Sequence, residues 1–308
     1  NLRLYVPITA PERPFIPARS LLVRCRACNI DQGRVRVAEL ISAYSPSVWG
    51  ILLATGVLIG LLAGFLGVGG GVIAVPILLE VFDLMGVAEP AAIALAVGTA
   101  QASILLSSVT AVAAHWRAGT IDRTLVRAWL PALIVGTVLG LAFSPFAPAR
   151  LLTALFAVVA AMLAFKLALG DRLIFASRTP IGPFSLAVPA IVGALAAAVG
   201  VGGGTLSTPV LSLFSFPIKR AIGAGALFNL LISLPATAFF LAADLGAPGR
   251  PGDALGDVAL FCVAALSLPA LVVAPVAVRW SAGAPATLLR QSFAFCLAAV
   301  ALRMLLRS

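Results

Sequence analysis

Two clusters of glycine are the residues of this chain whose type and spacing best suit chemistry, and that chemistry is the binding of an anion. The clusters are Gly69, Gly70 and Gly71 in the first half and Gly202, Gly203 and Gly204 in the second. Each glycine destabilises a helix by about 1 kcal/mol relative to alanine, so each cluster predicts a break between two helices. A helix that begins after a break points free N–H groups and the positive end of its dipole toward it, which stabilises an anion.

Neutral polar side chains complete the predicted substrate site. They are Thr99, Gln101, Thr205 and Asn229. Hydroxyl and amide groups bind an anion through hydrogen bonds and avoid the cost of burying a cation. The competing interpretation is that Gln101 and Asn229 only join helices, where such bonds contribute about 0.6 to 2 kcal/mol. The residues alone leave both interpretations open.

Catalysis is not expected from this sequence. An intramembrane enzyme would need paired carboxylates, a histidine cluster or a Ser/Lys dyad within apolar segments. The chain holds one histidine, His115, which we interpret as a solvated residue at the boundary of an apolar segment. A nucleotide site is also disfavoured, because the first glycine cluster matches neither the dinucleotide fingerprint nor the P-loop pattern. We therefore predict no enzyme, no metal site and no cofactor.

The composition places the glycine clusters in a membrane. Hydrophobic residues make up 61% of the 308 residues and charged residues only 10%, whereas a soluble domain is about a quarter charged. Residues 49–79, 90–114, 128–149 and 179–218 contain no ionisable side chain. Since about 20 apolar residues cross a bilayer as a helix, we predict a multi-pass protein of the cell (cytoplasmic) membrane.

The excess of basic residues is interpreted as a determinant of topology. The formal net charge is +10, which in a soluble protein would suggest nucleic acid, but here the basic residues lie mostly between the apolar runs. The predicted partners are therefore the lipid bilayer and a small anionic substrate, with no nucleic acid. The oligomeric state stays open.

An internal repeat organises the chain. Six positions recur at a constant offset of 133 residues: Gly60, Gly67, Gly69, Gly70, Gly71 and Pro76 return as Gly193, Gly200, Gly202, Gly203, Gly204 and Pro209. We predict an all-α polytopic membrane protein of about eight transmembrane helices, arranged as two homologous four-helix repeats, each with a Gly-rich interrupted first helix. The predicted boundaries are 48–170 for repeat 1, 171–183 for a polar linker and 184–308 for repeat 2.

Residues 1–47 form an Arg/Pro-rich extension to which we assign no fold. Two interpretations stay open for it: a disordered segment, or a start site placed too far upstream.

The basic loops suggest how the helices run. If each glycine-broken pair makes one net crossing, the arginine-rich extension and Arg117 share the cytoplasmic side, and Glu80 lies on the other. Four net crossings per half would make the repeats parallel, and would leave Lys219 and Arg220 outside, against the positive-inside bias. Separately, Gly56, Gly60 and Gly64 recur at a spacing of four, which predicts close helix packing.

The motifs resemble those of the sulfite exporter TauE/SafE family. The segments concerned run from Gly64 to Pro76, through the second copy ending at Pro209, and from Ala113 to Asp122. The resemblance covers roughly residues 48–308. It implies a duplicated four-helix unit in the cytoplasmic membrane that moves small sulfur-containing anions such as sulfite, sulfoacetate or other organosulfonates.

The chain also departs from the pattern of that family. The Gly-Thr-Ser pattern of the family stands here as Gly98-Thr99-Ala100, and its second copy, at 223–225, lacks both hydroxyls. Substrate identity therefore does not transfer. We predict a secondary transporter that exports small sulfur-containing anions. The alternatives are a non-transporting membrane partner or assembly protein, and a transporter of an unrelated small solute.

Overall fold

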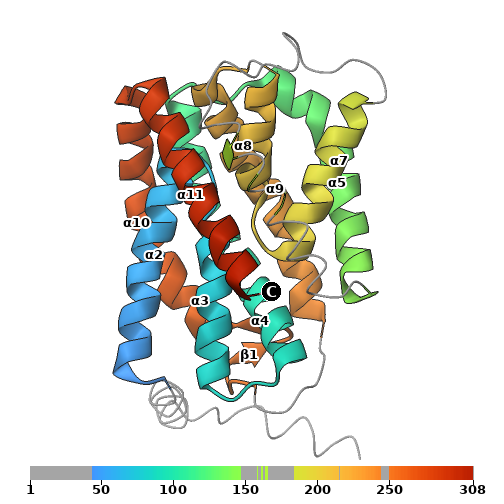
Figure 1. The fold of residues 1–308 in the computed structure, drawn as a ribbon, viewed down its shortest axis with the longest axis vertical. Coiled ribbons are helices and arrows are strands. Elements are labelled where there is room, and N and C mark those ends of the chain that lie inside the picture. Colours follow the sequence, from blue (N-terminus) through green and yellow to red (C-terminus); the bar gives the residue numbers. More distant parts are fainter. Residues whose placement is uncertain are drawn as a thin grey trace, which may run out of the picture. The chain divides into compact units, whose positions relative to one another are not determined.

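The computed structural model describes residues 44–146, 158, 161, 164–165, 184–214, 216–243 and 250–307. The predicted linker 171–183 and residues 1–43 of the predicted extension lie outside the described residues. The compact unit discussed below is Ser45–Ser308. Its elements, shown in Figure 1, are α2 (Pro46–Leu66), α3 (Gly71–Leu84), α4 (Glu89–Arg117), α5 (Arg123–Phe143), η3 (Ser144–Phe146), α7 (Phe184–Val199), α8 (Gly203–Leu213), α9 (Ile218–Ala242), β1 (Ala254–Leu255), β2 (Val258–Ala259), α10 (Leu260–Gly283) and α11 (Ala286–Arg307).

Five of the described helices are long and apolar enough to cross a membrane. They are α2, α4, α5, α9 and α10. Large apolar side chains point outward from them, including Val135 at 57% exposed, Leu268 at 63% and Val272 at 72%. A helix that is apolar on every face is stable in lipid. The chain is therefore a multi-pass all-α membrane protein, while the number of eight spans and the two repeats remain predictions.

Small residues let pairs of helices pack backbone against backbone. Along α2, Gly56, Gly60 and Gly64 face Leu266, Ala270 and Ala274 of α10 in that order. The residue numbers increase in the same direction along both helices, so α2 and α10 run parallel. The predicted packing role of these glycines is confirmed, because a Cβ at any of them would overlap the neighbouring backbone.

The same arrangement occurs between α5 and α7. Gly136 and Gly140 of α5 face Ala190 and Ala194 of α7, and Gly193 faces the α5 residue Thr137. These two helices also run parallel.

Each glycine-broken pair of helices returns to the end of the bundle from which it started (Figure 1). The start of α2 lies beside the start of α10, where the rings of Trp49 and Phe261 are 6.2 Å apart. The start of α10 lies beside the first half of α4, because the Thr99 hydroxyl accepts a hydrogen bond from Ala259 N. Only four residues separate the end of α3 from the start of α4. The predicted single net crossing of α2 and α3 is therefore wrong.

The second pair enters from the opposite end of the bundle. The helix α7 runs parallel to α5, and α8 leads through a short turn into α9. The start of α9 lies beside the start of α5, where Arg220 and Asp122 form an ion pair at 3.6 Å. The pair α7–α8 thus starts and ends where α5 begins. The two broken pairs point toward each other, so the predicted parallel orientation of the two halves is also wrong.

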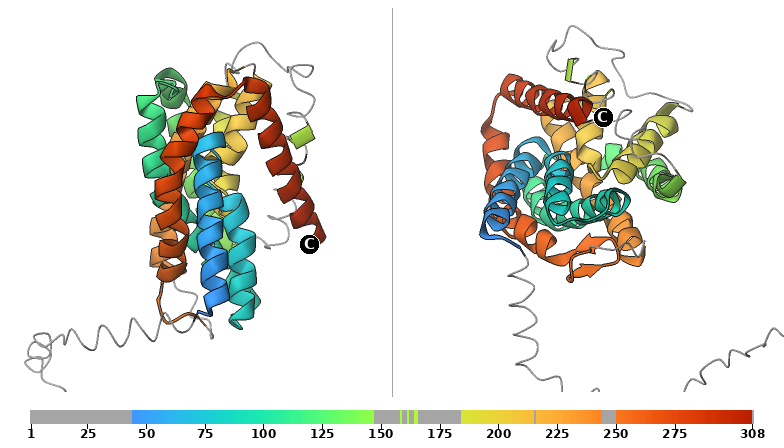
Figure 2. Two further views of the ribbon diagram at one scale, coloured as in Figure 1. Left: turned by 90° about the vertical axis from the view of Figure 1, so that its left-hand side faces the viewer. Right: turned by 60° about the horizontal axis from the view of Figure 1, so that its bottom comes forward.

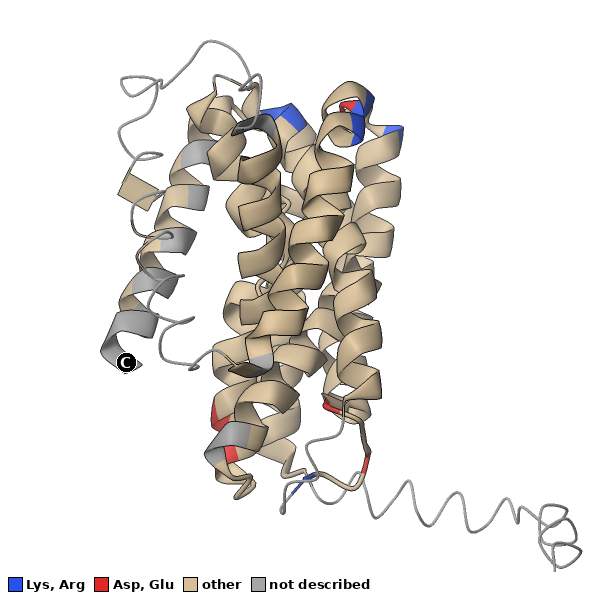
Figure 3. Cartoon of the chain, turned by 90° about the vertical axis from the view of Figure 1, so that its right-hand side faces the viewer, with Lys and Arg blue, Asp and Glu red and all other residues tan. Residues whose placement is uncertain are grey.

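Charged residues separate to the two ends of the bundle (Figure 3), whose helices Figure 2 shows from two further sides. One end, which we call the basic end, holds the end of α4 and the starts of α5 and α9, and with them Arg117, Asp122, Arg123, Arg127, Lys219 and Arg220. The other, which we call the acidic end, holds the end of α3 and the hairpin before α10, and with them Glu80, Asp83, Arg250, Asp253 and Asp257.

This separation removes the predicted conflict at Lys219 and Arg220. They lie with Arg117 at the basic end, because the pair α7–α8 does not cross. By the positive-inside bias we expect the basic end to face the cytoplasm. The start of α2, where the predicted extension ends, lies at the other end of the bundle, so the prediction that it shares a side with Arg117 is wrong as well.

Candidate substrate site at the crossing of the two breaks

The glycine clusters break the helices because the backbone there has positive φ. The helix α2 ends at Leu66 and is capped by Gly67 with φ 68°, and Gly69 and Gly70 follow with φ 74° and 73°. In the second half, Gly200 and Gly202 both have φ 78°. Residues with a side chain rarely adopt this conformation, whereas glycine adopts it at little cost. The sequence therefore ends α2 and α7 at the predicted positions.

The two breaks meet inside the bundle. A Cβ added to Gly71 would overlap the carbonyl of Gly200, and one added to Gly204 would overlap the carbonyl of Gly67. The hydroxyl of Thr205 donates to the carbonyl of Val68 at 2.9 Å, which ties the second break to the first. We call this meeting point the crossing. It forms because no side chain separates the two backbones.

Asn229 of α9 bridges the two breaks. Its Nδ2 donates to the carbonyl of Gly67 at 2.9 Å, and its Oδ1 accepts from the backbone N–H of Gly204 at 2.6 Å. Its side chain also lies against Gly69 and Gly202. Asn229 is 1% exposed. It therefore satisfies an end carbonyl of α2 and a first-turn N–H of α8, both of which lack partners within their own helices.

Gln101 of α4 binds the end of the helix before the second break. Its Nε2 donates to the carbonyl of Ala196 at 3.2 Å, and its Oε1 accepts from the Ser233 hydroxyl at 2.8 Å. All of these groups are buried. Sequence reasoning did not include Ser233 among the site residues, and the only signal for it was its place on the same apolar span as Asn229.

Thr99 lies elsewhere. Its hydroxyl accepts from Ala259 N at 2.9 Å, at the small hairpin formed by β1 and β2. This contact joins α4 to the start of α10 and is not part of the crossing. The structure thus brings together the predicted glycines, Thr205 and Asn229, places Gln101 at the adjacent end of α7, and sets Thr99 apart.

The electrostatic character of the crossing comes from backbone and neutral side chains. The helices α3, of 14 residues, and α8, of 11 residues, both begin there, so two positive helix ends converge on it. Its polar side chains are those of Thr205 and Asn229, and the buried pair of Gln101 and Ser233 lies at the adjacent end of α7. A small oxyanion binds through hydrogen-bond donors and needs no basic side chain, so N–H groups at helix starts, amides and hydroxyls suit it.

Further hydroxyl groups are buried without a hydrogen-bond partner among the described residues. They belong to Ser108 of α4, Ser207 of α8, Thr237 of α9 and Ser267 of α10. Ser207 follows the first turn of α8, one turn from the second break. A buried hydroxyl without a partner is costly, and a polar ligand or water next to α8 would satisfy it.

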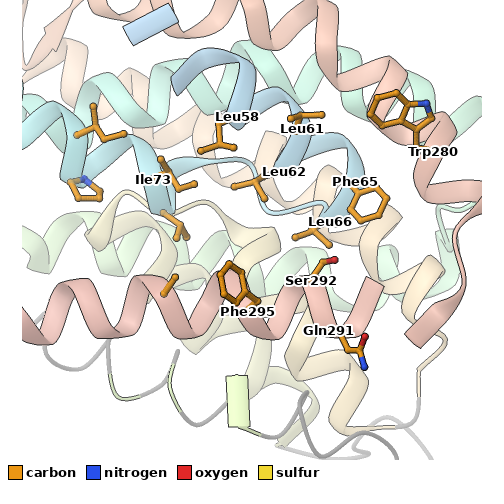
Figure 4. Close-up of a pocket in the computed structure, with 14 residues that line it drawn as sticks. Leu58, Leu61, Leu62, Phe65, Leu66, Ile73, Trp280, Gln291, Ser292 and Phe295 are labelled. Atoms are coloured by element: carbon orange, nitrogen blue, oxygen red, sulfur yellow. The ribbon is translucent and has the colours of Figure 1, made fainter. Parts of the chain in front are cut away.

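An apolar groove of about 910 Å³ opens beside the first break (Figure 4). Leu66 and Val72, on either side of the break, contribute to its wall, and Phe65 and Phe295 face it from α2 and α11. Gln291 and Ser292 are the polar side chains in its lining. An anion would gain few hydrogen bonds there, so the groove does not extend the candidate site. In the described part of the chain no cluster of three metal-ligating side chains occurs.

Comparison with known proteins gives the relationships of the chain. Residues 52–304 match the family described as "Sulfite exporter TauE/SafE". The chain is similar to a probable membrane transporter protein of Haemophilus influenzae, with 29% identity over 213 residues that cover 68% of this chain and 80% of that protein. It is also similar to a probable membrane transporter protein of Methanocaldococcus jannaschii, with 28% identity over 182 residues that cover 56% of this chain and 64% of that protein. No solved structure matches the chain.

Proposed function

Since the chain belongs to the sulfite exporter TauE/SafE family, a family of membrane transporters, we propose that it exports small sulfur-containing anions, such as sulfite or organosulfonates, across the cytoplasmic membrane. The observation that carries the proposal is the crossing, where two helix N-termini and neutral donors converge within the bundle.

The chemistry of the crossing favours an anion over a cation. The N–H groups at the starts of α3 and α8 and the amide of Asn229 are donors, whereas a cation would need carboxylates or free carbonyls. The carbonyls of Gly67 and Val68 already accept from Asn229 and Thr205. The anion would replace Asn229 as the partner of α8 and would recruit hydroxyls such as that of Ser207.

The dense packing of the crossing favours a small substrate. Gly71 and Gly204 have no room for a methyl group. A sulfite or sulfonate group, with one central atom and three oxygens, needs only a modest separation of the two breaks. A large solute would require the four helices that meet there to move apart.

A binding and transport experiment tests the proposal. Thermal unfolding of the purified protein is measured with sulfite, thiosulfate, sulfoacetate, taurine, sulfate and a neutral solute, because a ligand that binds only the folded state raises the midpoint. Counterflow of labelled substrate into proteoliposomes then reports transport. Gly203→Leu should abolish both the ligand shift and counterflow. The matched control is Gly50→Leu, at an exposed site with open space around the glycine, which should retain both.

Three outcomes separate the candidate functions. A shift and counterflow with a sulfur anion, lost only in Gly203→Leu, support the proposal. A response to the neutral solute instead would indicate a transporter of another substrate. Folded protein that neither shifts nor transports any of these solutes, and in which Gly203→Leu changes only stability, would favour a non-transporting membrane partner.

A further inference from the structure

We propose that the apolar groove formed by α2, α3, α10 and α11 binds one anionic phospholipid. Its acyl chain fills the groove, and its headgroup lies at the basic end of the bundle (Figure 4). The groove has a volume of about 910 Å³ and lies beside the first break, outside the crossing. The inference goes beyond the proposed function and does not depend on which solute the chain transports.

The groove opens toward the surroundings of the bundle. Three of the side chains that line it are well exposed: Leu58 at 42%, Trp280 at 61% and Phe295 at 77%. Two of its walls, α2 and α10, are long and apolar enough to cross a membrane. A space of this size left empty would deprive its lining of van der Waals partners. Because acyl chains surround such helices in a bilayer, an acyl chain is the material that fills it.

The shape of the lining suits an extended chain. On α2 the lining residues share one face of the helix: Leu58, Leu61, Leu62, Phe65 and Leu66. Eight residues of helix rise about 12 Å, and the lining of α11 covers the same length, from Gln291 to Ala299. The apolar surface therefore follows the helices, as a hydrocarbon chain that enters from one end requires.

The polar end of the groove lies at the basic end of the bundle. Figure 4 shows Trp280 and Gln291 at one end of the groove and Ile73 toward the other. Trp280 is in the last turn of α10, and Gln291 and Ser292 are in the second turn of α11. Tryptophan is enriched where a membrane meets water. This gradient matches a phospholipid, with the ester and headgroup region at Gln291 and Ser292 and the chain directed toward Ile73.

Lys219 provides one positive charge beside this polar end. Its Nζ donates to the carbonyl of Ala282 in the last turn of α10 at 2.8 Å, which uses one of the three N–H groups of the ammonium. The preceding residue, Ile218, packs in one cluster with Leu289 of α11, and Phe65, which lines the groove, packs against the same cluster. The ammonium is thus held where α9, α10 and α11 meet.

Arg279 provides a second positive charge. It is exposed and directly precedes Trp280, which lines the groove. The acidic side chain described at this end, Asp122, pairs with Arg220. Two cations beside an apolar groove favour an anionic headgroup over a zwitterionic one. If the basic end faces the cytoplasm, as the positive-inside bias predicts, the headgroup lies in the leaflet that carries anionic lipid.

Native mass spectrometry of the delipidated full-length protein measures the binding. The protein in detergent is titrated with dioleoyl phosphatidylglycerol, which is anionic, and with dioleoyl phosphatidylcholine, which is zwitterionic. We expect one tightly bound phosphatidylglycerol per chain. Its Kd should be about tenfold or more below that of phosphatidylcholine, because each cation near an anionic headgroup contributes roughly a fivefold factor.

A charge variant and its control test the headgroup position. Lys219→Gln combined with Arg279→Gln should abolish the preference for phosphatidylglycerol. The control is Arg117→Gln combined with Arg127→Gln, which removes two exposed charges from α4 and α5 at the same end. That control has the same change in net charge and should keep the preference.

A second pair of variants tests the position of the acyl chain. Ala299→Trp places a large side chain in the groove and should weaken the binding of both lipids by about tenfold or more. The matched control, Ala298→Trp, introduces the same side chain at a neighbouring exposed residue that does not line the groove, and should bind both lipids normally. Gel filtration and thermal unfolding confirm that each variant is folded. The charge variants keep the test valid if Ala299→Trp does not fold.

Three outcomes would overturn the inference. Equal affinity for the two lipids would show that no headgroup is selected. A preference that is lost in the control charge pair rather than at Lys219 and Arg279 would place the lipid elsewhere. A dimer in lipid-free detergent that Ala299→Trp dissociates would show that a second copy of the chain covers the groove. None of these measurements uses a sulfur anion, so the proposed function stands or falls separately.

Discussion

Replacing Asn229 by leucine tests the crossing most directly. Leucine has the branched shape of asparagine but is bulkier, so the change removes two hydrogen bonds without opening a cavity. The carbonyl of Gly67 and the N–H of Gly204 would lose their partner in a buried site. An unsatisfied buried group costs about 1–3 kcal/mol, and interhelical bonds in membranes average about 0.6 kcal/mol each. We therefore expect Asn229→Leu to lower the free energy of unfolding by about 2–4 kcal/mol.

Equilibrium unfolding in mixed detergent micelles measures this loss, and proteoliposome counterflow measures the accompanying loss of transport. The control is Thr55→Ala, which removes a buried hydroxyl that bonds only within its own helix, to the carbonyl of Ile51. We expect that control to cost less than about 1 kcal/mol and to keep transport. A loss for Asn229→Leu no larger than that of Thr55→Ala would refute the role of Asn229 as the bridge between the breaks.

The remaining predictions concern packing, the acidic end and topology. Gly204→Ala should strongly lower the thermal unfolding midpoint in detergent, because its methyl group would overlap a carbonyl, whereas Gly50→Ala, in open space on a helix, should leave the midpoint unchanged or raise it slightly. Asp257→Asn removes one partner of a buried ion pair, and we expect a loss of about 3–5 kcal/mol in the same micelle unfolding assay; a loss below about 1 kcal/mol would mean that the pair is solvated. In a cysteine-free background, Ser47→Cys and Arg220→Cys should react with a membrane-impermeant maleimide from opposite sides of the membrane, and labelling from one side would contradict the described orientation of the pairs.

The positions of the breaks could be predicted from the sequence because backbone conformation is a local property. Consecutive glycines mark where φ becomes positive, and both α2 and α7 end there. The spacing of four in Gly56, Gly60 and Gly64 similarly marks a packing face. Both features depend on residues a few positions apart.

The direction in which the chain continues after each break could not be predicted from the sequence. The start of α3 is set by contact of Gly71 with the distant Gly200, and that contact depends on the whole bundle. Arg117 and Glu80 lie at opposite ends of the bundle, as the basic and acidic loops predicted, but the start of α2 lies at the end opposite to the predicted one.

Helical geometry explains why Thr99 lies apart from the crossing and why His115, predicted to be solvated, is buried. Thr99 and Gln101 are two residues apart, which is about 200° around a helix, so they face different neighbours: Thr99 the hairpin and Gln101 the end of α7. His115 follows the same rule. Its neighbour Trp116 is 51% exposed while the histidine itself is buried.

The crossing also has a consequence for the energetics of motion. Its closest contacts are between glycine backbones, and glycine has no side-chain rotamers to freeze or release. Separating the two breaks therefore changes rotamer entropy mainly at the side chains that bridge them, Asn229 and Thr205, and at the isoleucines packed against Gly70, Gly71 and Gly203. The free energy of opening is then governed by how well water or substrate replaces a handful of hydrogen bonds. A contact of this kind is tightly packed and yet costs little free energy to reverse, which is the property that the proposed transport site requires.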